Sequence, residues 1–546
     1  MTSSRTLRHL FTASSSLHDG RAPTLTRRGF LLAGASLAVV GCSSGSSDSR
    51  SDTSVPSVTP SSPSSPPAAG TLVTGPVRRS QNGLLNTELR VQFATNRVGN
   101  RQIHTRTYEG NIPRPSLRLR PGDTLRLRLL NNLPPEAGEE PMDINMPHDF
   151  NFTNLHTHGL HVSPKQNANG SLADNVLIDV EPGASQLYEI AIPSNHPDGT
   201  YWYHPHKHGS SAVQLMSGMA GALIIEGATD AFLAERGITA EQTLILQQLR
   251  VDAAGEAEFV NANSFLAPPI FTLNGLLTPT LTIRPGEVQR WRFIHAGMAE
   301  HSPLELRDPA GRLVPLHQMA FDGITLPSME DTTRLFLASG NRIDVLMQLD
   351  TPGTYQLVKP ALAQGLPTDP VREAAIATVV VSGTPANMAL PLGRFPTSLA
   401  PITDAELNSA PRRVTFSMDL SKRPPLFLVD GKLFDPTRVD QLIRLHAVEE
   451  WTVFNTSPAD HPFHIHQNPF LVTHVAGDAT ALPDVRLPVW LDTINVPRAT
   501  NFGRPNARPG SVTFRSRFED FAGKFVLHCH ILDHEDMGMM QIVEIV

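Results

Sequence analysis

A block of sequence that occurs three times, at intervals of about 160 residues, most constrains the fold of this chain. The first two copies, Leu117–Arg128 and Leu281–Arg292, are closely similar, and a looser third copy runs from Ile443 to Asn455. Each copy has two stretches of alternating apolar and polar residues around a turn, a pattern typical of half-buried antiparallel strands. The 546-residue chain is therefore predicted to contain three similar β units and to bury large cores.

A second repeated block closes each unit, at Gly199–His204, Gly353–Val358 and Gly523–His528. The first and third copies end in paired histidines, whereas the second ends without them. The middle unit is therefore predicted to have the same fold without the metal chemistry, and to act as a spacer that fixes the outer two. An independent binding module is the alternative, because a fold alone does not assign a function. We predict an all-β chain of three β-sandwich domains, over residues 71–227, 228–385 and 386–546.

Cys529 is flanked by His528 and His530 and is followed by His534 and Met539. Successive side chains of a strand point to opposite faces, so an extended segment turns both flanking histidines one way and Cys529 the other. One segment can thus serve two metal sites that lie back to back. A thiolate and imidazoles with a weak axial thioether are the ligand set of a blue-copper electron-transfer centre. An electron that reaches Cys529 would cross one residue of backbone to metals held by its neighbours.

Three further segments carry histidines at i, i+2 spacing, which on a strand aims two rings at one space. With the pair around Cys529 they supply eight imidazoles, enough for a three-metal cluster, and His461 is left to join Cys529, His534 and Met539 at a single-metal site. Zinc is the alternative metal, but a structural zinc site closes with four ligands, fewer than this set offers. The three segments are His156-Thr157-His158, His204-Pro205-His206 and His461-Pro462-Phe463-His464-Ile465-His466.

These four segments resemble the four copper signatures of the multicopper oxidases, the family of laccases, bilirubin oxidases and bacterial spore-coat and periplasmic copper oxidases. The resemblance extends from about Gly70 to Val546, and all twelve ligand positions of the pattern are filled. It implies that the three domains are cupredoxin-like Greek-key β-sandwiches, with a trinuclear copper cluster between domains 1 and 3. It also implies one type 1, one type 2 and two type 3 copper ions in each chain.

The resemblance assigns the ligands of these copper ions residue by residue. It places the type 1 copper at His461, Cys529, His534 and Met539. It places the type 2 copper at His156 and His464. The coupled type 3 pair would be held by His158, His204, His206, His466, His528 and His530.

Reduction of dioxygen to water takes four electrons, whereas most organic donors release one electron at a time. The resemblance therefore implies a laccase-like oxidase, in which electrons from a phenol or an aromatic amine pass through Cys529 to His528 and His530. It implies that His534 is the ligand at which the type 1 site contacts the electron donor. A thioether at Met539 lowers the reduction potential relative to Leu or Phe, which favours a low-to-middle potential. The expected partners are a small-molecule electron donor and dioxygen, and the chain is expected to be a monomer.

Oxygen reduction also consumes protons, and two carboxylates are candidates to relay them. Glu535 matches the position of a relay carboxylate in bacterial members of the family; the alternative is a surface acid that caps a turn. Asp174 is the candidate for the second cluster carboxylate, although its spacing from the first histidine pair differs from that of bacterial relatives. Three neighbours of the ligands fit no motif position and are interpreted as supporting or surface groups: His161, Lys207 and His208.

The substrate is less constrained by the sequence. Cuprous-ion oxidases of this family carry a methionine-rich insertion, whereas the 14 methionines here are scattered and the stretch Thr384–Pro411 contains only Met388. Oxidation of cuprous, manganese or iron ions is the alternative activity. A copper-binding protein of the cell envelope without turnover, and a scaffold like the copper-free division-associated relatives, are the non-enzymatic alternatives. Copper nitrite reductases use a smaller ligand set shared between subunits, which does not match four motifs in one chain.

The N-terminus is predicted to be an export signal over residues 1–42. Thr26–Leu31 resembles the twin-arginine consensus, and the apolar run from Phe30 to Val40 is too short to span a bilayer. Cys42 follows in a sequence that resembles a lipoprotein processing box, which predicts lipid anchoring; ordinary cleavage to a soluble product is the alternative. Residues 43–70 are rich in Ser and Pro and are predicted to form a flexible tether.

The expected location is therefore the periplasm or the cell envelope, reached by the twin-arginine route. Cys42 and Cys529 are the only cysteines, so a metal-bound Cys529 leaves no partner for an intramolecular disulfide. A net charge of −7 with scattered basic residues gives no footprint for nucleic-acid binding.

Overall fold

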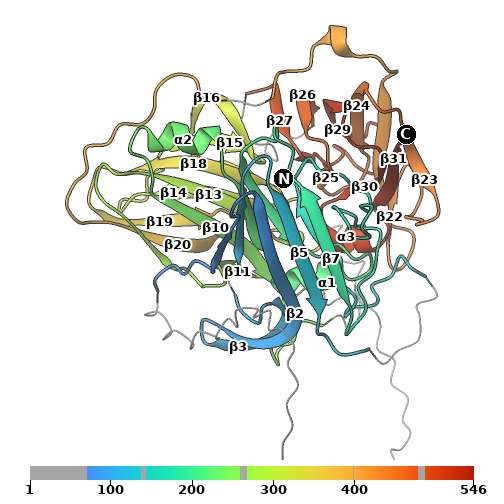
Figure 1. The fold of residues 1–546 in the computed structure, drawn as a ribbon, viewed down its shortest axis with the longest axis horizontal. Coiled ribbons are helices and arrows are strands. Elements are labelled where there is room, and N and C mark those ends of the chain that lie inside the picture. The colour runs from blue at the N-terminus through green and yellow to red at the C-terminus, as the bar shows by residue number, and fades with distance from the viewer. Residues whose placement is uncertain (1–69, 113, 137–142, 259–266, 397–398, 478–485) are drawn as a thin grey trace, which may run out of the picture. The chain divides into compact units, whose positions relative to one another are not determined.

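The computed structural model describes residues 70–546, apart from residue 113 and the segments 137–142, 259–266, 397–398 and 478–485. The predicted export signal with Cys42, and the predicted tether up to residue 69, lie outside the described residues. The described residues form six β-sheets, and each sheet takes its strands from one of three consecutive stretches of the chain (Figure 1). These stretches fall within the predicted ranges 71–227, 228–385 and 386–546 and are called domains 1, 2 and 3 below. The all-β prediction is confirmed.

Domain 1 is a sandwich of two sheets with the strand orders β3-β2-β5-β7 and β1-β4-β9-β8-β6. Alternating apolar residues of both sheets meet in one core, in which Leu89 and Leu127 of the first sheet join Leu117 and Leu223 of the second. Its elements are β1 (Val77–Arg79), β2 (Leu84–Val98), β3 (Arg101–Tyr108), β4 (Ser116–Leu119), β5 (Thr124–Asn131), β6 (His156–His158), β7 (Ser185–Ala191), β8 (Gly199–His204), α1 (Ser211–Met216) and β9 (Gly221–Ile225).

Domain 2 has sheets with the orders β11-β10-β13-β18-β15-β16 and β12-β20-β19-β14-β17. Its elements are α2 (Ala228–Ala234), β10 (Glu241–Leu249), β11 (Ile270–Leu273), β12 (Thr280–Ile283), β13 (Val288–Ala296), β14 (Ser302–Arg307), β15 (Leu316–Phe321), β16 (Ile324–Thr332), β17 (Leu335–Leu337), β18 (Arg342–Gln348), β19 (Gly353–Lys359) and β20 (Ala374–Val381).

Domain 3 has sheets with the orders β22-β21-β24-β29-β26-β27 and β23-β31-β30-β25-β28. Its apolar core is continuous with that of domain 2, since Trp291 and Trp451 belong to one buried cluster. Its elements are the short 3-10 helix η2 (Asp404–Glu406), β21 (Arg412–Asp419), β22 (Leu426–Val429), β23 (Val439–Ile443), β24 (Ala447–Asn455), β25 (His461–Ile465), β26 (Phe470–Ala476), β27 (Val489–Leu491), β28 (Thr493–Val496), β29 (Gly510–Phe518), β30 (Gly523–Cys529), α3 (Leu532–Asp536) and β31 (Met540–Ile545). In the part of the chain that the structure describes, no helix has the length and apolar character needed to cross a bilayer.

The first sequence repeat forms two strands that a turn carries into opposite sheets of each sandwich: β4 and β5, β12 and β13, and β23 and β24. The turn contains one residue with positive φ in every domain, namely Gly122 at 91°, Gly286 at 69° and His446 at 68°. The prediction of antiparallel strands is wrong in part, because β4 runs parallel to both β1 and β9, and β13 runs parallel to β10. Alternation along a strand reports which face is buried and not the direction of its neighbours.

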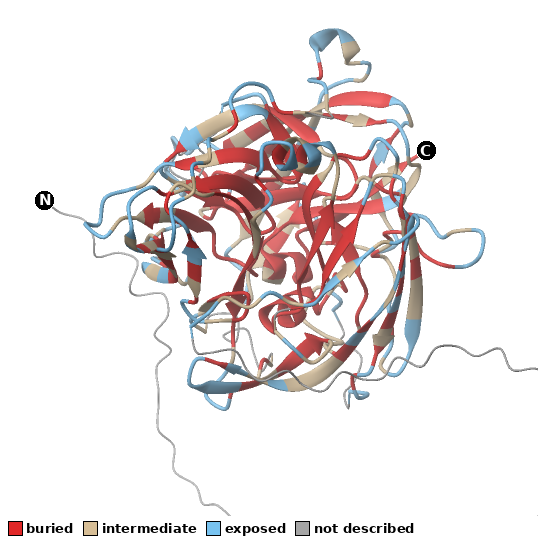
Figure 2. Cartoon of the chain, turned by 60° about the vertical axis from the view of Figure 1, so that its left-hand side comes forward, coloured by how far each residue is buried: buried red, intermediate tan, exposed pale blue. Residues whose placement is uncertain are grey.

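The prediction of half-buried strands fails at β13, where all nine residues are buried. Domain 1 covers the outer face of this strand. Arg292 Nη1 donates to Thr200 Oγ1 of domain 1 at 3.0 Å and lies 3.2 Å from Asp344 Oδ2. The polar positions that looked solvated in the sequence therefore form a buried ion network between two domains. Figure 2 shows buried residues throughout the interiors of the sandwiches, with exposed residues mostly in the outer loops.

The second sequence repeat forms β8, β19 and β30, which hold the same place in the three five-stranded sheets. In these sheets β8 lies next to β6, β19 next to β14, and β30 next to β25. The sheets of domains 2 and 3 have one further edge strand beyond this pair, β17 and β28 respectively. β8 ends at His204 and β30 at Cys529, whereas β19 ends at Lys359. The same strand of the fold thus ends in candidate metal ligands in the outer domains and in a lysine in the middle domain.

Candidate metal centres

Paired neighbouring strands place the histidines of each outer domain. In domain 1, β6 pairs with β8 so that His156 lies opposite His204. In domain 3, β25 pairs with β30 so that His464 lies opposite His528. Since the side chains at i and i+2 point to the same face, each strand pair presents two histidine pairs to one side of its sheet.

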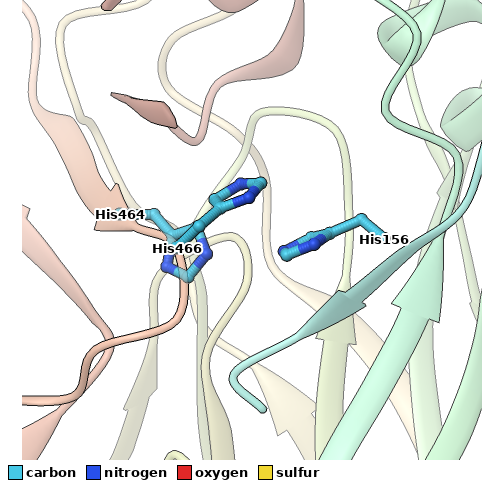
Figure 3. Close-up of side chains that lie close together, drawn as sticks. All are labelled: His156, His464 and His466. Carbon is cyan, nitrogen blue, oxygen red and sulfur yellow. The ribbon is translucent and has the colours of Figure 1, made fainter. Parts of the chain in front are cut away.

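The histidine faces of domains 1 and 3 meet. His156 stacks on His466 with ring centroids 3.8 Å apart, and His158 stacks on His464 at 3.9 Å. Figure 3 shows His156 on its domain 1 strand facing His464 and His466 of domain 3. Neither domain presents the full set of eight rings alone, so the candidate cluster exists only where the two domains meet.

The eight rings form three groups of three, with His466 in two of them, and the candidate ligand atoms within each group lie within 4.8 Å of one another. The six histidines that the resemblance assigned to the type 3 pair separate into two groups of three, which are called the two triads below. The sequence did not show this division. The groups are His156 with His464 and His466, His158 with His204 and His530, and His206 with His466 and His528.

Hydrogen bonds fix the tautomers of these rings. His464 Nδ1 donates to the Asp492 carbonyl oxygen at 2.7 Å, His204 Nδ1 to the Pro205 carbonyl at 2.9 Å, and His528 Nδ1 to the Cys529 carbonyl at 3.0 Å. A neutral imidazole that donates from Nδ1 has its lone pair on Nε2. The Nε2 atoms of five cluster histidines are buried without a hydrogen-bond partner: His156, His158, His204, His464 and His530.

The protonation state suits a metal. Burial lowers the pKa of the cluster histidines, to about 3 for His206 and about 4 for His464, so the rings are neutral at physiological pH. Metal binding requires neutral imidazoles, and converging lone pairs of nitrogen are a donor set that fits copper. The residues present therefore fit a cluster of copper ions.

The second candidate centre lies around the cysteine. Cys529 Sγ is 3.4 Å from His461 Nδ1 and 4.0 Å from His534 Nδ1, and these two nitrogens are 3.3 Å apart. Here the rings offer Nδ1, the opposite nitrogen from the cluster histidines. Burial raises the pKa of the Cys529 thiol well above its ordinary value, so the thiolate needs a bound cation.

The segment after Cys529 brings its remaining candidate ligands back to the thiol. α3 carries His534, and the Met539 N–H donates to the His534 carbonyl at 2.9 Å. The Cys529 N–H donates to the Met539 carbonyl at 3.0 Å, so Met539 lies beside Cys529 and is fully buried. Phe427 stacks on the His534 ring with centroids 4.0 Å apart, which holds the ring in place.

Both predicted carboxylates lie beside cluster histidines. Asp174 Oδ2 accepts from His156 Nδ1 at 3.0 Å, and burial raises the pKa of Asp174 to about 7. Glu535 is fully buried, which contradicts the alternative of a surface acid. Its Oε1 accepts from Ser211 Oγ at 3.3 Å and lies 3.7 Å from His206 Nδ1.

The three neighbours that fit no motif position take supporting places. His161 Nδ1 donates to the Gln467 carbonyl at 2.8 Å, which ties domain 1 to the residue after His466. Lys207 Nζ donates to the His208 carbonyl at 2.9 Å, and the His208 ring meets Phe434 edge-on with centroids 4.6 Å apart.

Sequence reasoning missed several residues that hold the ligands. Asp492 binds His464 through its carbonyl, Ser457 Oγ lies 2.7 Å from His461 Nε2, and Arg342 lies 3.2 Å from His158. Asp492 had one available signal, since it is a lone acid between the apolar segments that form β27 and β28. Ser457 and Arg342 had none, because nothing in their local sequence distinguishes them from other polar residues of a strand or turn.

Comparison with known proteins gives one family. Models described as multicopper oxidase match residues 91–230 and 406–545. The multicopper oxidase mco of Staphylococcus haemolyticus is 24% identical over 488 residues, 86% of this chain and 90% of that protein. A laccase of Bacillus subtilis is 24% identical over 487 residues, 80% of this chain and 89% of that protein. A cell division protein FtsP of Actinobacillus succinogenes is 24% identical over 406 residues, 71% of this chain and 76% of that protein.

Solved structures with similar folds include a multicopper oxidase from Campylobacter jejuni, described as a metallo-oxidase. It has a TM-score of 0.70 at 24% identity and covers 88% of this chain and 96% of its own. The McoA multicopper oxidase from Aquifex aeolicus has a TM-score of 0.69 at 19% identity, over 88% of this chain and 99% of its own. At these identities the likeness shows the fold alone, and the predicted architecture of three cupredoxin-like sandwiches is confirmed.

Proposed function

The chain belongs to the multicopper oxidase family and is an oxidase, and we propose that it couples the one-electron oxidation of phenols and aromatic amines to the four-electron reduction of dioxygen to water. One observation carries this proposal. Cys529 belongs to the group that also contains His461 and His534, whereas its two neighbours, His528 and His530, belong to different histidine triads. One residue of backbone therefore connects the site that would take up electrons with the sites that would use them.

The donor atoms support a division of labour between the two centres. Copper held at Cys529, His461, His534 and Met539 would accept single electrons, and copper held by the eight cluster histidines would pass them to dioxygen in fours. The protein's part is to hold neutral rings in fixed orientations, through partners such as Asp174 on His156. By this division His156 and His464 would hold the single copper ion of the cluster, and each of the two triads would hold one ion of the coupled pair.

Glu535 is suited to supply protons at the edge of the cluster. Burial, and then the neighbouring Asp536, raise the pKa of Glu535 well above its ordinary value, which favours the protonated carboxyl. Its Oε2 is buried without a hydrogen-bond partner, while Oε1 lies 3.7 Å from His206 Nδ1. A proton held on Glu535 thus lies close to the Nδ1 atom of a cluster ligand.

A cavity of about 250 Å³ beside the cysteine centre is the place where we expect the electron donor to bind. It is lined by Leu426, which precedes the Phe427 ring stacked on His534, and by Met537, which lies between His534 and Met539. The volume is below the roughly 300–1,000 Å³ typical of drug-sized ligands, so it favours a donor with a single ring.

Oxidation of a metal ion is the second candidate activity, and one observation favours it. Met146 and Met537 line the same cavity, and so does Asp143. Thioethers bind cuprous ion in preference to harder cations. The two activities are separated by replacing Met146 with Leu, which keeps the volume but removes the sulfur. Cuprous-ion oxidation is expected to fall if the metal is the substrate, and phenol oxidation is expected to persist.

The first test is the copper content and the visible spectrum of the copper-loaded protein. We expect about four copper ions per chain and an intense thiolate-to-copper band that a phenol bleaches and air restores. The matched control is Cys529→Ser, which should lose the band and the oxidation of phenol while the cluster keeps its copper. Protein without the band, or a band that survives Cys529→Ser, would contradict the proposal and favour a scaffold or a copper-storage role.

A further inference from the structure

A short segment of domain 2 reaches the candidate cluster between domains 1 and 3. This segment, Ser339–Arg342, lies in the connection after β17 and ends at the first residue of β18. Ser339 Oγ lies 3.3 Å from His530 Nδ1, on the side of the ring away from the cluster. Gly340 has φ +94°, and a Cβ atom on it would lie 3.0 Å from His530 Nε2 and 3.2 Å from His158 Nε2. Backbone of domain 2 therefore touches ligand rings that come from both outer domains.

Arg342 connects all three domains from a fully buried position. Toward domain 1, its Nη1 lies 3.2 Å from His158 Nδ1 and its Nε donates to the Thr200 carbonyl at 3.1 Å. Toward domain 3, its Nη1 donates to Asp492 Oδ1 at 2.8 Å, and its Nη2 donates to the other carboxylate oxygen of Asp492. Such a bidentate pair of a guanidinium with a carboxylate fixes both position and orientation.

Asp492 carries this restraint to a second ligand. Its carbonyl oxygen accepts from His464 Nδ1 at 2.7 Å. Domain 2 also holds the backbone at this point, since Asp322 Oδ2 accepts from the N–H groups of Asp492 and Thr493, both at 3.1 Å. Asn341 Nδ2 donates to the Thr493 carbonyl at 2.8 Å. The start of β28, which pairs with the strand that bears His464, is thus bound to domain 2 on several sides.

These contacts differ from an ordinary ion pair between domains because they end on the ring nitrogens of ligands. An acceptor on the nitrogen that does not face the metal orients a histidine and tunes its basicity, and the Asp492 carbonyl is such an acceptor for His464. The Arg342 guanidinium has no acceptor and acts on His158 by its position beside the ring. Arg292 provides the comparison. It is equally buried in domain 2, binds Thr200 Oγ1 and three carboxylates, and belongs to the ion network around β13.

We propose that the segment Ser339–Arg342 of domain 2 is part of the framework of the copper cluster, and that Arg342 positions His464 through Asp492 and limits the space of the His158 ring beside it. This rests on the proposed function, since it requires copper at the histidine cluster. Domain 2 then contributes no ligand of its own but determines whether the ligands of the other two domains are correctly oriented. The sequence, by contrast, predicted a spacer that only fixes the outer domains.

The test compares Arg342→Met and Arg342→Lys with the control Arg292→Met, all as full chains loaded with copper. The readouts are copper per chain, the intensity of the thiolate-to-copper band, and retention of cluster copper against a chelator. For Arg342→Met we expect an unchanged band but cluster copper held roughly 10–100-fold less tightly. Arg342→Lys should recover part of the loss, because lysine keeps the positive charge but cannot form the bidentate pair with Asp492. Arg292→Met should hold cluster copper as tightly as the wild type.

The outcomes separate this inference from the proposed function. Wild-type affinity for cluster copper in Arg342→Met, or an equal loss in Arg292→Met, would show that the segment only joins domains. If Arg342→Met fails to fold, Arg342→Lys and Ser339→Ala, which removes a single hydroxyl beside His530, decide the question. Wild-type copper retention in both would overturn the proposal. A wild-type chain that binds no copper would instead contradict the proposed function itself.

Discussion

Buried carboxyl groups beside the ligands are the residues whose chemistry is most readily tested. Glu535→Gln keeps the size and the hydrogen bond from Ser211 but cannot give up a proton. We expect reoxidation of the reduced enzyme by dioxygen to slow by roughly 10²–10⁴-fold, the range for a positioned general acid. Reduction of the cysteine centre by a donor under anaerobic conditions should change little.

The matched control for this prediction is Glu519→Gln, which removes an exposed carboxylate of the same domain. It should leave both half-reactions unchanged. An equal slowing of both half-reactions by Glu535→Gln would remove Glu535 from the path of the protons.

Local spacing explains why the ligand sets could be found from sequence while their supports could not. His528 and His530 flank Cys529 on one strand, so their directions follow from the pleat alone. Arg342 and Asp492 are 150 positions apart and meet only because three domains pack together. No local pattern records a partner on another domain. The division of the six paired histidines into two triads was inaccessible for the same reason, because each triad draws rings from both outer domains.

Among the structural elements, the turn after β6 shows how tightly the cluster is enclosed. Gly159 has φ +89°, and a Cβ atom on it would overlap Arg342 Nη2 and Asp492 Oδ2. Gly159→Ala should therefore lower stability by about 1–3 kcal/mol beyond the cost of the backbone conformation, and displace Arg342. The control is Gly170→Ala, because Gly170 has φ +82° and no atom within 4 Å of the added carbon. Thermal unfolding of the copper-free proteins measures the difference, and equal midpoints would refute the predicted overlap.

The strands formed by the sequence repeats show what repeats can and cannot predict. The three copies of each repeat form corresponding strands, so the number of sandwiches and the strands that carry the histidines followed from the sequence. The pairing directions did not, as the parallel neighbours of β4 show. The burial of β13 was also missed. Its arginines are typical of a solvent-facing strand, but domain 1 covers them in the structure.

For the whole molecule, the copper-free protein is expected to lose stability as the pH falls from about 6.5 to about 4. Burial lowers the pKa of all ten candidate ligand histidines below the ordinary 6.5, to about 3 for His206 and His534. In this range the unfolded chain binds protons that the folded chain does not, so acid favours unfolding by about 1.4 kcal/mol per pH unit for each such proton.

Buried carboxyl groups act in the opposite direction but are fewer. Burial raises the pKa of Asp174, Asp322 and Asp536 to about 7, of Asp533 to about 6, and of Glu535 well above its ordinary value. The folded chain therefore keeps protons on these five groups that the unfolded chain releases. The ten histidines outweigh these carboxyl groups. The denaturant concentration at the midpoint of unfolding should therefore be lower at pH 5 than at pH 7. A midpoint that rises on acidification would show that the carboxyl groups dominate.

The order of the ligands along the chain has a consequence for how the protein is made. Eight of the twelve candidate ligands follow residue 460, and five of them lie between His528 and Met539, close to the C-terminus. A chain cut short before His528 would lack the thiolate and one ring from each triad. Capture of metal at the cysteine centre therefore depends on translation beyond Met539, so the proposed colour of that centre would report that synthesis has passed this residue.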